Sequence, residues 1–413
     1  MRGPENAVLN GARAVRVFAC FALGYLLSYG LRSINAVIAP SLTSELALSN
    51  SDLGLLSSAY FIAFGCMQLP LGVWLDRYGS RRTESALLLC AALGAGVFAS
   101  SDSLTGLWIG RALIGMGVSA CLMAAFKAFR QWYAPEQQSQ LASWMLVAGT
   151  SGALIATVPV TLALPLIGWR GVFWIVALLL VLVAAALFFL LRDVEQDFAG
   201  ARSASAGGGY GLIFRSTYFW RLGVAGLLIH GTFFALQTLW AGPWMMTVLG
   251  KSQAQTGQIL FYFNLVLLLS YVALGWCAPR MAKRGWNMHR VIGAGLGGMV
   301  VTLVFIWFAT SPQGWLLWLP LAVCVPLTTL LQSQAGLAFP AAMAGRANTA
   351  YNMMLFMGAF AAQWGFGLVI DVAARAGATQ PEAFRTALAV AIALQTAALA
   401  YFIFSRAQPA QGA

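Results

Sequence analysis

An arginine and two tyrosines occur at helical spacing inside an apolar stretch of the chain. Tyr25, Tyr29 and Arg32 stand at positions i, i+4 and i+7, which places both phenols and the guanidinium on one face of a helix. A guanidinium is a planar fork of hydrogen-bond donors that matches a carboxylate or a phosphate. The spacing therefore predicts an anion clamp, to which the nearby Asn35 could add a hydrogen bond.

The sequence offers Arg32 no evident ionic partner. The chain has only 12 acidic residues, and their positions predict that all of them lie in loops or near the ends of apolar stretches. An unpaired charge inside a membrane costs several kcal/mol, so it should face a cavity or a partner. We expect a substrate anion to neutralise Arg32. A structural bond from its guanidinium to helix carbonyls, or a misplaced helix boundary, is the alternative.

A lone histidine, His230, lies near the middle of another apolar stretch, with Gln237 seven residues on along the same face. Imidazole titrates near about pH 6.5, so His230 could bind substrate or carry a proton, or it could be a quiet packing residue. Other polar residues within apolar stretches could line the same cavity or hold helices together. They are Asn264, Gln332, Asn352 and Gln363, with Gln68, Thr150 and Gln334 as further candidates.

Membrane helices must position these residues, as the composition indicates. Of 413 residues, 60% are hydrophobic and only 9% are charged, whereas soluble domains carry about 25% charged residues. A helix needs roughly 20 apolar residues to cross a membrane. We predict an all-α integral membrane protein with twelve transmembrane helices, at residues 15–39, 53–75, 84–101, 104–129, 140–165, 170–191, 218–241, 255–278, 291–311, 315–338, 348–372 and 384–405.

A polar segment divides these stretches into two sets of six. It includes acidic residues and the Gly- and Ser-containing run 203–209, which is typical of a flexible linker. The charged stretch 275–285 faintly repeats 72–82, so the two halves look like pseudo-repeats, and substrate sites in such folds lie between the repeats at the membrane midplane. We predict an N-terminal six-helix bundle at 1–192, a cytoplasmic linker at 193–216 and a C-terminal six-helix bundle at 217–413.

The distribution of basic residues predicts the orientation. With a cytoplasmic N-terminus, eighteen Lys and Arg residues fall on the cytoplasmic side, and only Arg170, Lys251, Arg375 and Arg385 fall on the other. Such a bias is typical of inserted helices, so we expect both termini in the cytoplasm. The bias also accounts for the net charge of +12 without a nucleic-acid partner.

Motifs of other protein classes are missing from the sequence. We find no metalloprotease motif and no phosphate-binding loop, and the six cysteines lie in apolar stretches without paired spacing. We therefore expect neither an enzyme nor a cofactor or bound metal, and we interpret the cysteines as small packing residues.

A compact charged loop follows the second apolar stretch. It combines Gly72, Asp76, Arg77, Gly79, Arg81 and Arg82. This pattern resembles the loop between the second and third helices of major facilitator superfamily transporters. The resemblance implies a cytoplasmic latch in which Asp76, beside Arg77 and near the two later arginines, forms charge-assisted hydrogen bonds. Simple membrane-flanking charge is the alternative.

Two further segments resemble the same superfamily. The stretch 107–117 is similar to its fourth-helix motif, which implies a role in substrate or proton coupling for Arg111, although this side chain could instead snorkel to the outer interface. The stretch 29–35 resembles the first helix of anion-transporting branches, where Tyr and Arg engage a carboxylate or phosphate. Those branches often have Asp before the Arg, and here the residue is Leu31.

The sequence thus predicts a secondary transporter that moves a small organic anion by alternating access. We expect a monomer in the lipid bilayer of a bacterial inner membrane, coupled as a symporter to protons through His230, through water linked to Arg111 or through the carboxylate of the substrate. One alternative is transport of a metal ion or metal chelate, because Met353, Met354 and Met357 could bind Cu(I). A multidrug or metabolite exporter is another, although the fifth stretch lacks the Gly-Pro-rich motif of drug antiporters.

Overall fold

The computed structural model describes residues 9–134, 137–197, 210–339 and 343–405, and within these ranges it contains helices and no strand. A helix satisfies all of its backbone hydrogen bonds internally, which is the condition for crossing a lipid bilayer. Ten helical segments are long and apolar enough to span a membrane. The predicted all-α membrane fold is confirmed.

Two glycines divide long helices into separate crossings. Helix α3 (Asn50–Ser100) turns at Gly79, where φ is +80°, and α7 (Val158–Leu190) turns at Gly168, where φ is +65°. Residues other than glycine rarely adopt such positive φ angles. With both turns counted, the helices form the twelve predicted crossings.

The remaining crossings consist of one helix or of a few short ones in series. They are α1 (Gly11–Ser33) with α2 (Asn35–Leu46), α4 (Leu104–Gly117) with α5 (Cys121–Trp132), and α6 (Gln138–Ile155) with the first part of α7. In the second half they are α10 (Thr217–Ala225) through α11 (Gly231–Ala235) to α12 (Ala241–Thr247), α13 (Gln253–Lys283), α14 (Met288–Phe308), α15 (Trp318–Leu337), α16 (Ala344–Arg375) and α17 (Gln380–Phe404).

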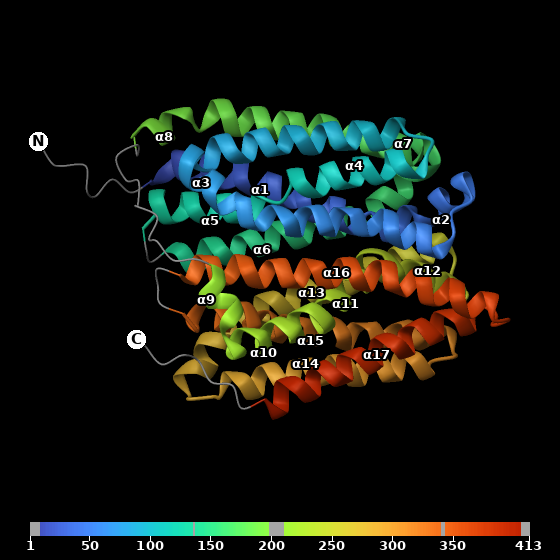
Figure 1. Cartoon of the computed structure of the whole chain (residues 1–413). Helices are drawn as coiled ribbons and strands as arrows, with labels where there is room; N and C mark the ends of the chain where they lie inside the picture. Colours follow the sequence, from blue (N-terminus) through green and yellow to red (C-terminus); the bar gives the residue numbers. More distant parts are fainter. Residues whose placement is uncertain (1–8, 135–136, 198–209, 340–342, 406–413) are drawn as a thin grey trace, which may run out of the picture.

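The two sets of helices lie side by side. Figure 1 shows α1 to α8 in its upper part and α9 to α17 in its lower part, with the start of α1 and the end of α17 toward the same side. The predicted linker contains two short helices, α8 (Arg192–Asp197) and α9 (Tyr210–Arg215), and residues 198–209 lie outside the described residues. The exact domain boundaries stay predictions.

The crossings that surround the centre are interrupted. The seventh contains two π-helical segments, η3 (Gly226–His230) and η4 (Leu236–Trp240), and the fourth is broken at 118–120 between α4 and α5. π-Helical turns inside α-helices are frequently found at functional sites. The seventh crossing also approaches α16 closely, since a Cβ on Gly358 would lie 1.9 Å from the Leu227 carbonyl oxygen.

The halves meet tightly at the end opposite the start of α1. A Cβ on Gly367 of α16 would lie 2.3 Å from the carbonyl oxygen of Asn50, at the start of α3. Beside this contact, the Asp371 carboxylate accepts hydrogen bonds from the backbone N–H groups of Asn50 and Ser51, at 3.3 and 2.8 Å. A carboxylate at a helix N-terminus satisfies unpaired N–H groups and interacts well with the helix dipole. This end of the molecule is closed.

We expect Asp371→Asn to weaken the closure, because it removes the negative charge from the N-terminus of α3. Spin labels on cysteines introduced at Asp102 and Thr310, in loops of the two halves at this end, should then report a larger population at long distance. The matched control is Asp52→Asn, which changes an acid of the same helix terminus that bonds only within its own turn. An unchanged distance distribution in Asp371→Asn would contradict the closing role.

Candidate functional site

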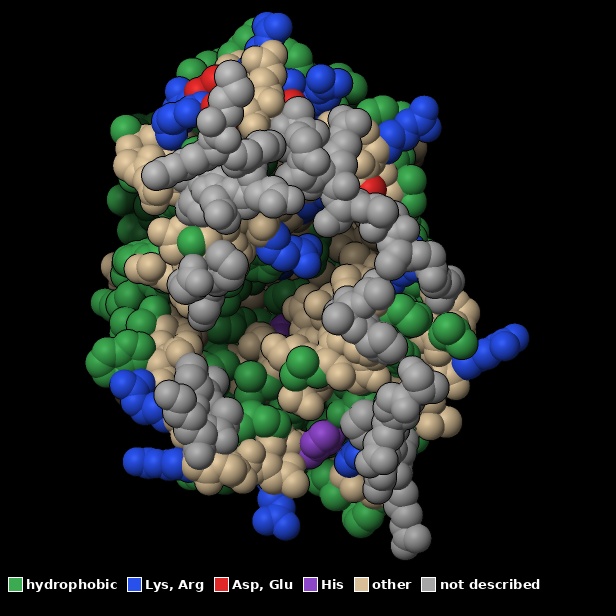
Figure 2. All heavy atoms as spheres, turned by 90° about the vertical axis from the view of Figure 1, so that its left-hand side faces the viewer, with side chains coloured by type: hydrophobic (Ala, Val, Ile, Leu, Met, Phe, Trp, Pro, Cys, Tyr) green, Lys and Arg blue, Asp and Glu red, His purple; other side chains and the backbone are tan. Residues whose placement is uncertain are grey.

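A cavity of about 360 Å³ lies between the two halves. Its walls come from α1, α3, α5 and α6 on one side and from η3, α13, α15 and α16 on the other. Figure 2 shows that the face at the left of Figure 1 is hollowed at its centre. The volume falls within the roughly 300–1,000 Å³ of small-molecule sites. The cavity is therefore closed at the Asp371 end and opens toward the opposite face.

Arg32 is the one charged side chain among the described residues that line this cavity. Only 6% of its surface is exposed, and its Nε atom has no hydrogen-bond partner. Five aromatic rings surround the guanidinium at 4.6–5.9 Å from its Cζ atom, those of Tyr29, Tyr60, Phe64, Phe234 and Phe356. Ring faces attract a cation, which offsets part of the cost of burying it. Among the described residues, no carboxylate forms an ion pair with this guanidinium.

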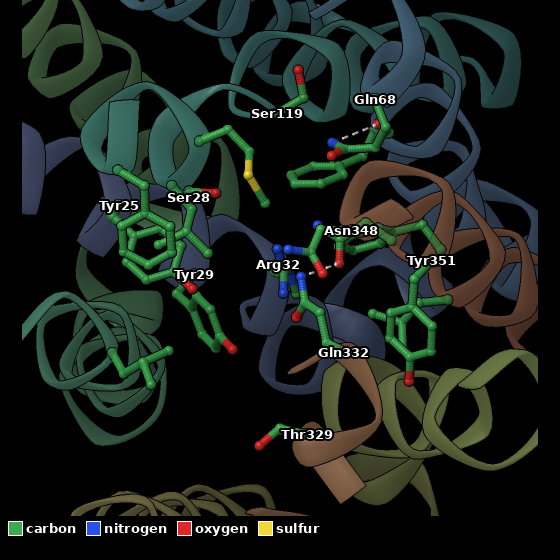
Figure 3. A pocket seen from close by; sticks show the side chains of 18 of the residues that line it. Tyr25, Ser28, Tyr29, Arg32, Gln68, Ser119, Thr329, Gln332, Asn348 and Tyr351 are labelled. Atoms are coloured by element: carbon green, nitrogen blue, oxygen red, sulfur yellow. Dashed lines mark hydrogen bonds between the residues drawn. The ribbon is translucent and has the colours of Figure 1, made fainter. Parts of the chain in front are cut away.

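The two predicted tyrosines share the cavity wall with Arg32. The rings of Tyr25 and Tyr29 lie 5.2 Å apart, edge to face, and both residues line the cavity. Figure 3 shows them on one side of Arg32. A Cβ on Gly149 of α6 would lie 2.5 Å from the Tyr25 ring, so this glycine provides the space for the phenol. The structure thus brings the predicted triad together, and its role in binding stays a prediction.

The opposite wall carries neutral polar groups. Gln332 donates to the Asn352 side-chain oxygen at 3.1 Å, and His230 Nδ1 lies 2.9 Å from the Thr328 hydroxyl. Asn348 Oδ1 and the Tyr351 hydroxyl are buried and have no hydrogen-bond partner. Figure 3 places Gln332, Asn348 and Tyr351 across from the tyrosines of α1.

Several lining residues were missed by the sequence analysis. Asn348 lies four residues before the predicted Asn352, and Phe64 lies four residues before Gln68, so both residues have a helical spacing that could have indicated them. Tyr271, by contrast, is a single phenol in an apolar stretch and has no such signal.

Four predicted binding residues do not line the cavity. Asn35 donates to Ser57 at 2.8 Å, Gln237 donates to Asn264 at 2.9 Å, and Gln363 donates to Thr238 at 3.2 Å. These side chains hold helices together near the closed end. The shared face expected for His230 and Gln237 assumed a regular helix, and η3 and η4 change the residues per turn between them.

Arg111 lies behind the cavity, and the expected alternative of snorkelling is wrong. The side chain is 1% exposed, and its Nη1 atom donates to the Leu31 carbonyl oxygen at 3.0 Å. The rings of Phe98 and Phe173 lie within 5.7 Å of its Cζ atom. Because α1 ends two residues after Leu31, Arg111 supports the backbone where the first crossing bends.

The predicted latch residues have other partners than expected. Asp76 pairs with Lys127 of α5 at 2.5 Å, and not with the arginines of its own loop. Arg81 donates to Glu195 of α8 and to the Phe188 carbonyl oxygen, both at 2.6 Å, while Arg82 lies 3.8 Å from Glu195.

The two glycines of the loop differ in their roles. Gly79 must be glycine because of its φ angle and because a Cβ would lie 2.7 Å from Glu195 Oε1, whereas a Cβ on Gly72 would meet nothing within 4 Å. Arg77 lies over the ring of the adjacent Tyr78. The loop is tied to the rest of the first half, and its latch function stays a prediction.

One expectation about acidic residues is wrong. Glu84 of α3 lies in the interior with 0% exposure, and not near a solvated helix end. Because α3 continues directly past the turn at Gly79, the residues after the turn are already covered by α1 and α5.

The methionines considered for Cu(I) do not gather at the cavity. The methyl group of Met357 would contact a Cβ on Gly65 of α3, and Met354 packs beside Gly223 of α10. Among the described residues no group of three or more His, Cys, Asp or Glu side chains is placed to hold a metal ion. The arrangement at the cavity suits an anion better than a cation.

Comparison with known proteins gives concordant matches. The model of the family Major Facilitator Superfamily matches residues 21–363. The hexuronate transporter of Escherichia coli (strain K12) is 27% identical over 310 residues, covering 70% of this chain and 69% of that protein. The 4-hydroxybenzoate transporter of Pseudomonas aeruginosa is 28% identical over 389 residues, covering 84% and 83%.

A solved structure shares the fold. The bacterial homolog of the human lysosomal transporter Spinster, in an inward-facing and unoccupied conformation, has a TM-score of 0.77 with 16% identity, and the match covers 95% of this chain and 97% of that chain.

We expect Glu195→Gln to destabilise the protein, because Arg81, whose side chain is only 5% exposed, would lose its ionic partner. A charged hydrogen bond lost at a buried site costs roughly 1–3 kcal/mol. The melting temperature of the purified protein in detergent should fall. Asp193→Asn, in the same helix but at an exposed ion pair, is the control and should change it much less. Equal melting temperatures for the two variants would argue against a buried tie at Arg81.

Proposed function

The chain belongs to the major facilitator superfamily, and from this premise we propose that it transports a small organic anion by alternating access to the central cavity. The observation that carries the proposal is Arg32, which has no ion-pair partner and is the one charged side chain among the described residues of the cavity wall. A carboxylate would fit its planar donor fork and neutralise its charge.

The composition of the cavity supports a hydroxylated monocarboxylate as the substrate. A single cation matches a single negative charge. Across from it, Gln332 and Asn348 can exchange hydrogen bonds with hydroxyl groups, while Phe64 and Phe356 offer faces to carbon-bound hydrogens or to an aromatic ring. Both a sugar acid and a hydroxybenzoate combine these features, and the names of the two relatives describe such compounds.

The proposal includes an orientation and an energy source. The bias of basic residues supports cytoplasmic termini in a bacterial inner membrane, and the cavity would then open toward the cytoplasm. We propose symport with protons into the cell. The inside-negative membrane potential opposes the entry of an anion unless a cation enters with it. The domain boundaries at 192 and 217 and a monomeric state belong to the same proposal.

We expect Arg32→Ala to abolish uptake of D-glucuronate or 4-hydroxybenzoate into proteoliposomes, and Arg32→Lys to weaken it. Losing one partner of a buried charge pair costs roughly 2–5 kcal/mol, which is at least about thirtyfold in affinity. Lysine keeps the charge but not the two-pronged geometry. The matched control is Arg375→Ala, which removes an exposed arginine at the end of α16. Uptake by Arg32→Ala with an unchanged KM would refute the clamp.

A second variant distinguishes the two anion classes. Gln332→Leu removes a hydrogen-bonding group from the wall opposite Arg32 while keeping most of its volume. We expect it to weaken competition by D-glucuronate, with its many hydroxyl groups, more than competition by 4-hydroxybenzoate. Equal losses for both compounds would place the hydroxyl-binding groups elsewhere. Gln313→Leu, on the 3₁₀ turn that precedes α15, is the control.

A further inference from the structure

A carboxyl group lies sealed inside the first half of the protein. Glu84 has 0% exposure, and neither of its carboxyl oxygens has a hydrogen-bond partner. Among the acidic residues that the structure describes, it is the only buried one. No Lys or Arg of the described ranges lies within ion-pair distance of it. The group is therefore unlike Asp76, Asp193, Glu195 and Asp197, each of which forms an ion pair with a basic side chain.

The carboxyl occupies a place left free by a glycine. A Cβ on Gly24 of α1 would lie 2.7 Å from Glu84 Oε1 and 3.9 Å from the thiol of Cys121, the first residue of α5. The other titratable group that interacts with the carboxyl is Cys20, one turn before Gly24 on α1. The Cys20 thiol also interacts electrostatically with Arg16. In α3 itself, Ser80 and Ser85 are also buried, and their hydroxyl groups form no hydrogen bond.

These surroundings determine the charge of the group in this conformation. An ionised carboxylate in the interior without a cation or hydrogen-bond donors costs several kcal/mol or more. The two cysteines are neutral and weak donors. Glu84 thus holds a proton in the conformation whose cavity opens toward the termini.

The pocket of Glu84 shares its walls with the substrate cavity. Gly24 precedes Tyr25 in α1, and Cys121 precedes Leu122 in α5, and both of these following residues line the cavity. The break at 118–120 lies immediately before Cys121, and Val118 and Ser119 line the cavity as well. A movement of α1 or α5 during alternating access would therefore open the pocket of Glu84 to water.

We propose that Glu84 binds and releases the proton that is coupled to anion transport, an inference that rests on the proposed function. Arg32 lies eight residues after Gly24 in α1, and a Cβ on Gly24 would meet the Glu84 carboxyl, so both groups act on the same helix. An anion that neutralises Arg32 and a proton that neutralises Glu84 stabilise the same position of α1. Substrate and proton therefore promote the binding of each other, as symport requires. Release is the transfer of the carboxyl proton to water.

Infrared spectroscopy of purified protein tests whether Glu84 carries a proton. We expect the wild-type spectrum at neutral pH to contain the C=O stretch of a protonated carboxylic acid, and Glu84→Gln to lack it. Glu84→Asp, which keeps the acid, should shift this band without removing it. Glu382→Gln, an exposed acid whose helix cap also accepts Gln, is the control and should leave the band unchanged. A wild-type spectrum without the band overturns the proposal.

Transport in proteoliposomes tests the coupling. In wild-type protein a proton gradient should accelerate uptake of D-glucuronate or 4-hydroxybenzoate, and we expect Glu84→Gln to reduce this acceleration at least about fivefold. The variant should keep counterflow of the same anion. A merely structural role would lower both activities together, and an intact response to the gradient would also overturn the proposal. If wild-type protein transports neither compound, the proposed function fails, whereas the infrared experiment still decides whether Glu84 holds a proton.

Discussion

The rest of the structure depends on keeping one guanidinium, that of Arg32, inside a membrane protein where no described side chain supplies a counterion. Aromatic rings from both halves surround it and reduce the cost of burial, yet its Nε atom remains unpaired. Arg111, another buried arginine, resolves the same problem differently, because it donates to the backbone at the bend of the first crossing. Arg111 therefore has a structural partner, whereas Arg32 has none and is the group that we propose to bind the anion.

Close helix packing at the closed end completes this arrangement. Glycines of α3, α12 and α16 let backbones of opposite halves approach, and the polar pairs around Gln237 and Gln363 fill the space between Arg32 and that end. Such buried amide pairs hold helices together when both partners are satisfied. The cavity is therefore tightly closed at the Asp371 end. At the opposite end of the molecule, the ion pairs of Arg81 and Lys127 connect helices within the first half only.

Much of this could be predicted from the sequence, where local pattern decides the structure. The crossings follow from apolar length, and Tyr25, Tyr29 and Arg32 share a face because α1 is a regular helix through Ser33. Prediction failed where geometry is irregular or distant. The π-helical segments altered the face of Gln237, and the partners of Asp76 and Arg81 come from α5 and α8, which no spacing rule connects to the loop.

Glu84 shows why burial cannot be inferred from distance along the chain to a charged loop. It stands only two residues after Arg82, whose side chain is largely exposed, yet the turn at Gly79 directs the next helix at once beneath α1. The glycine at position 24 then matters more than the neighbouring charges, since its missing Cβ creates the space for the carboxyl. Two ionisable groups, Arg32 on α1 and Glu84 beside Gly24 of the same helix, thus have no ion-pair partner among the described residues. A helix that moves as a rigid body would change the surroundings of both groups in one step, and under the proposed coupling this movement would let binding at one group alter the charge of the other.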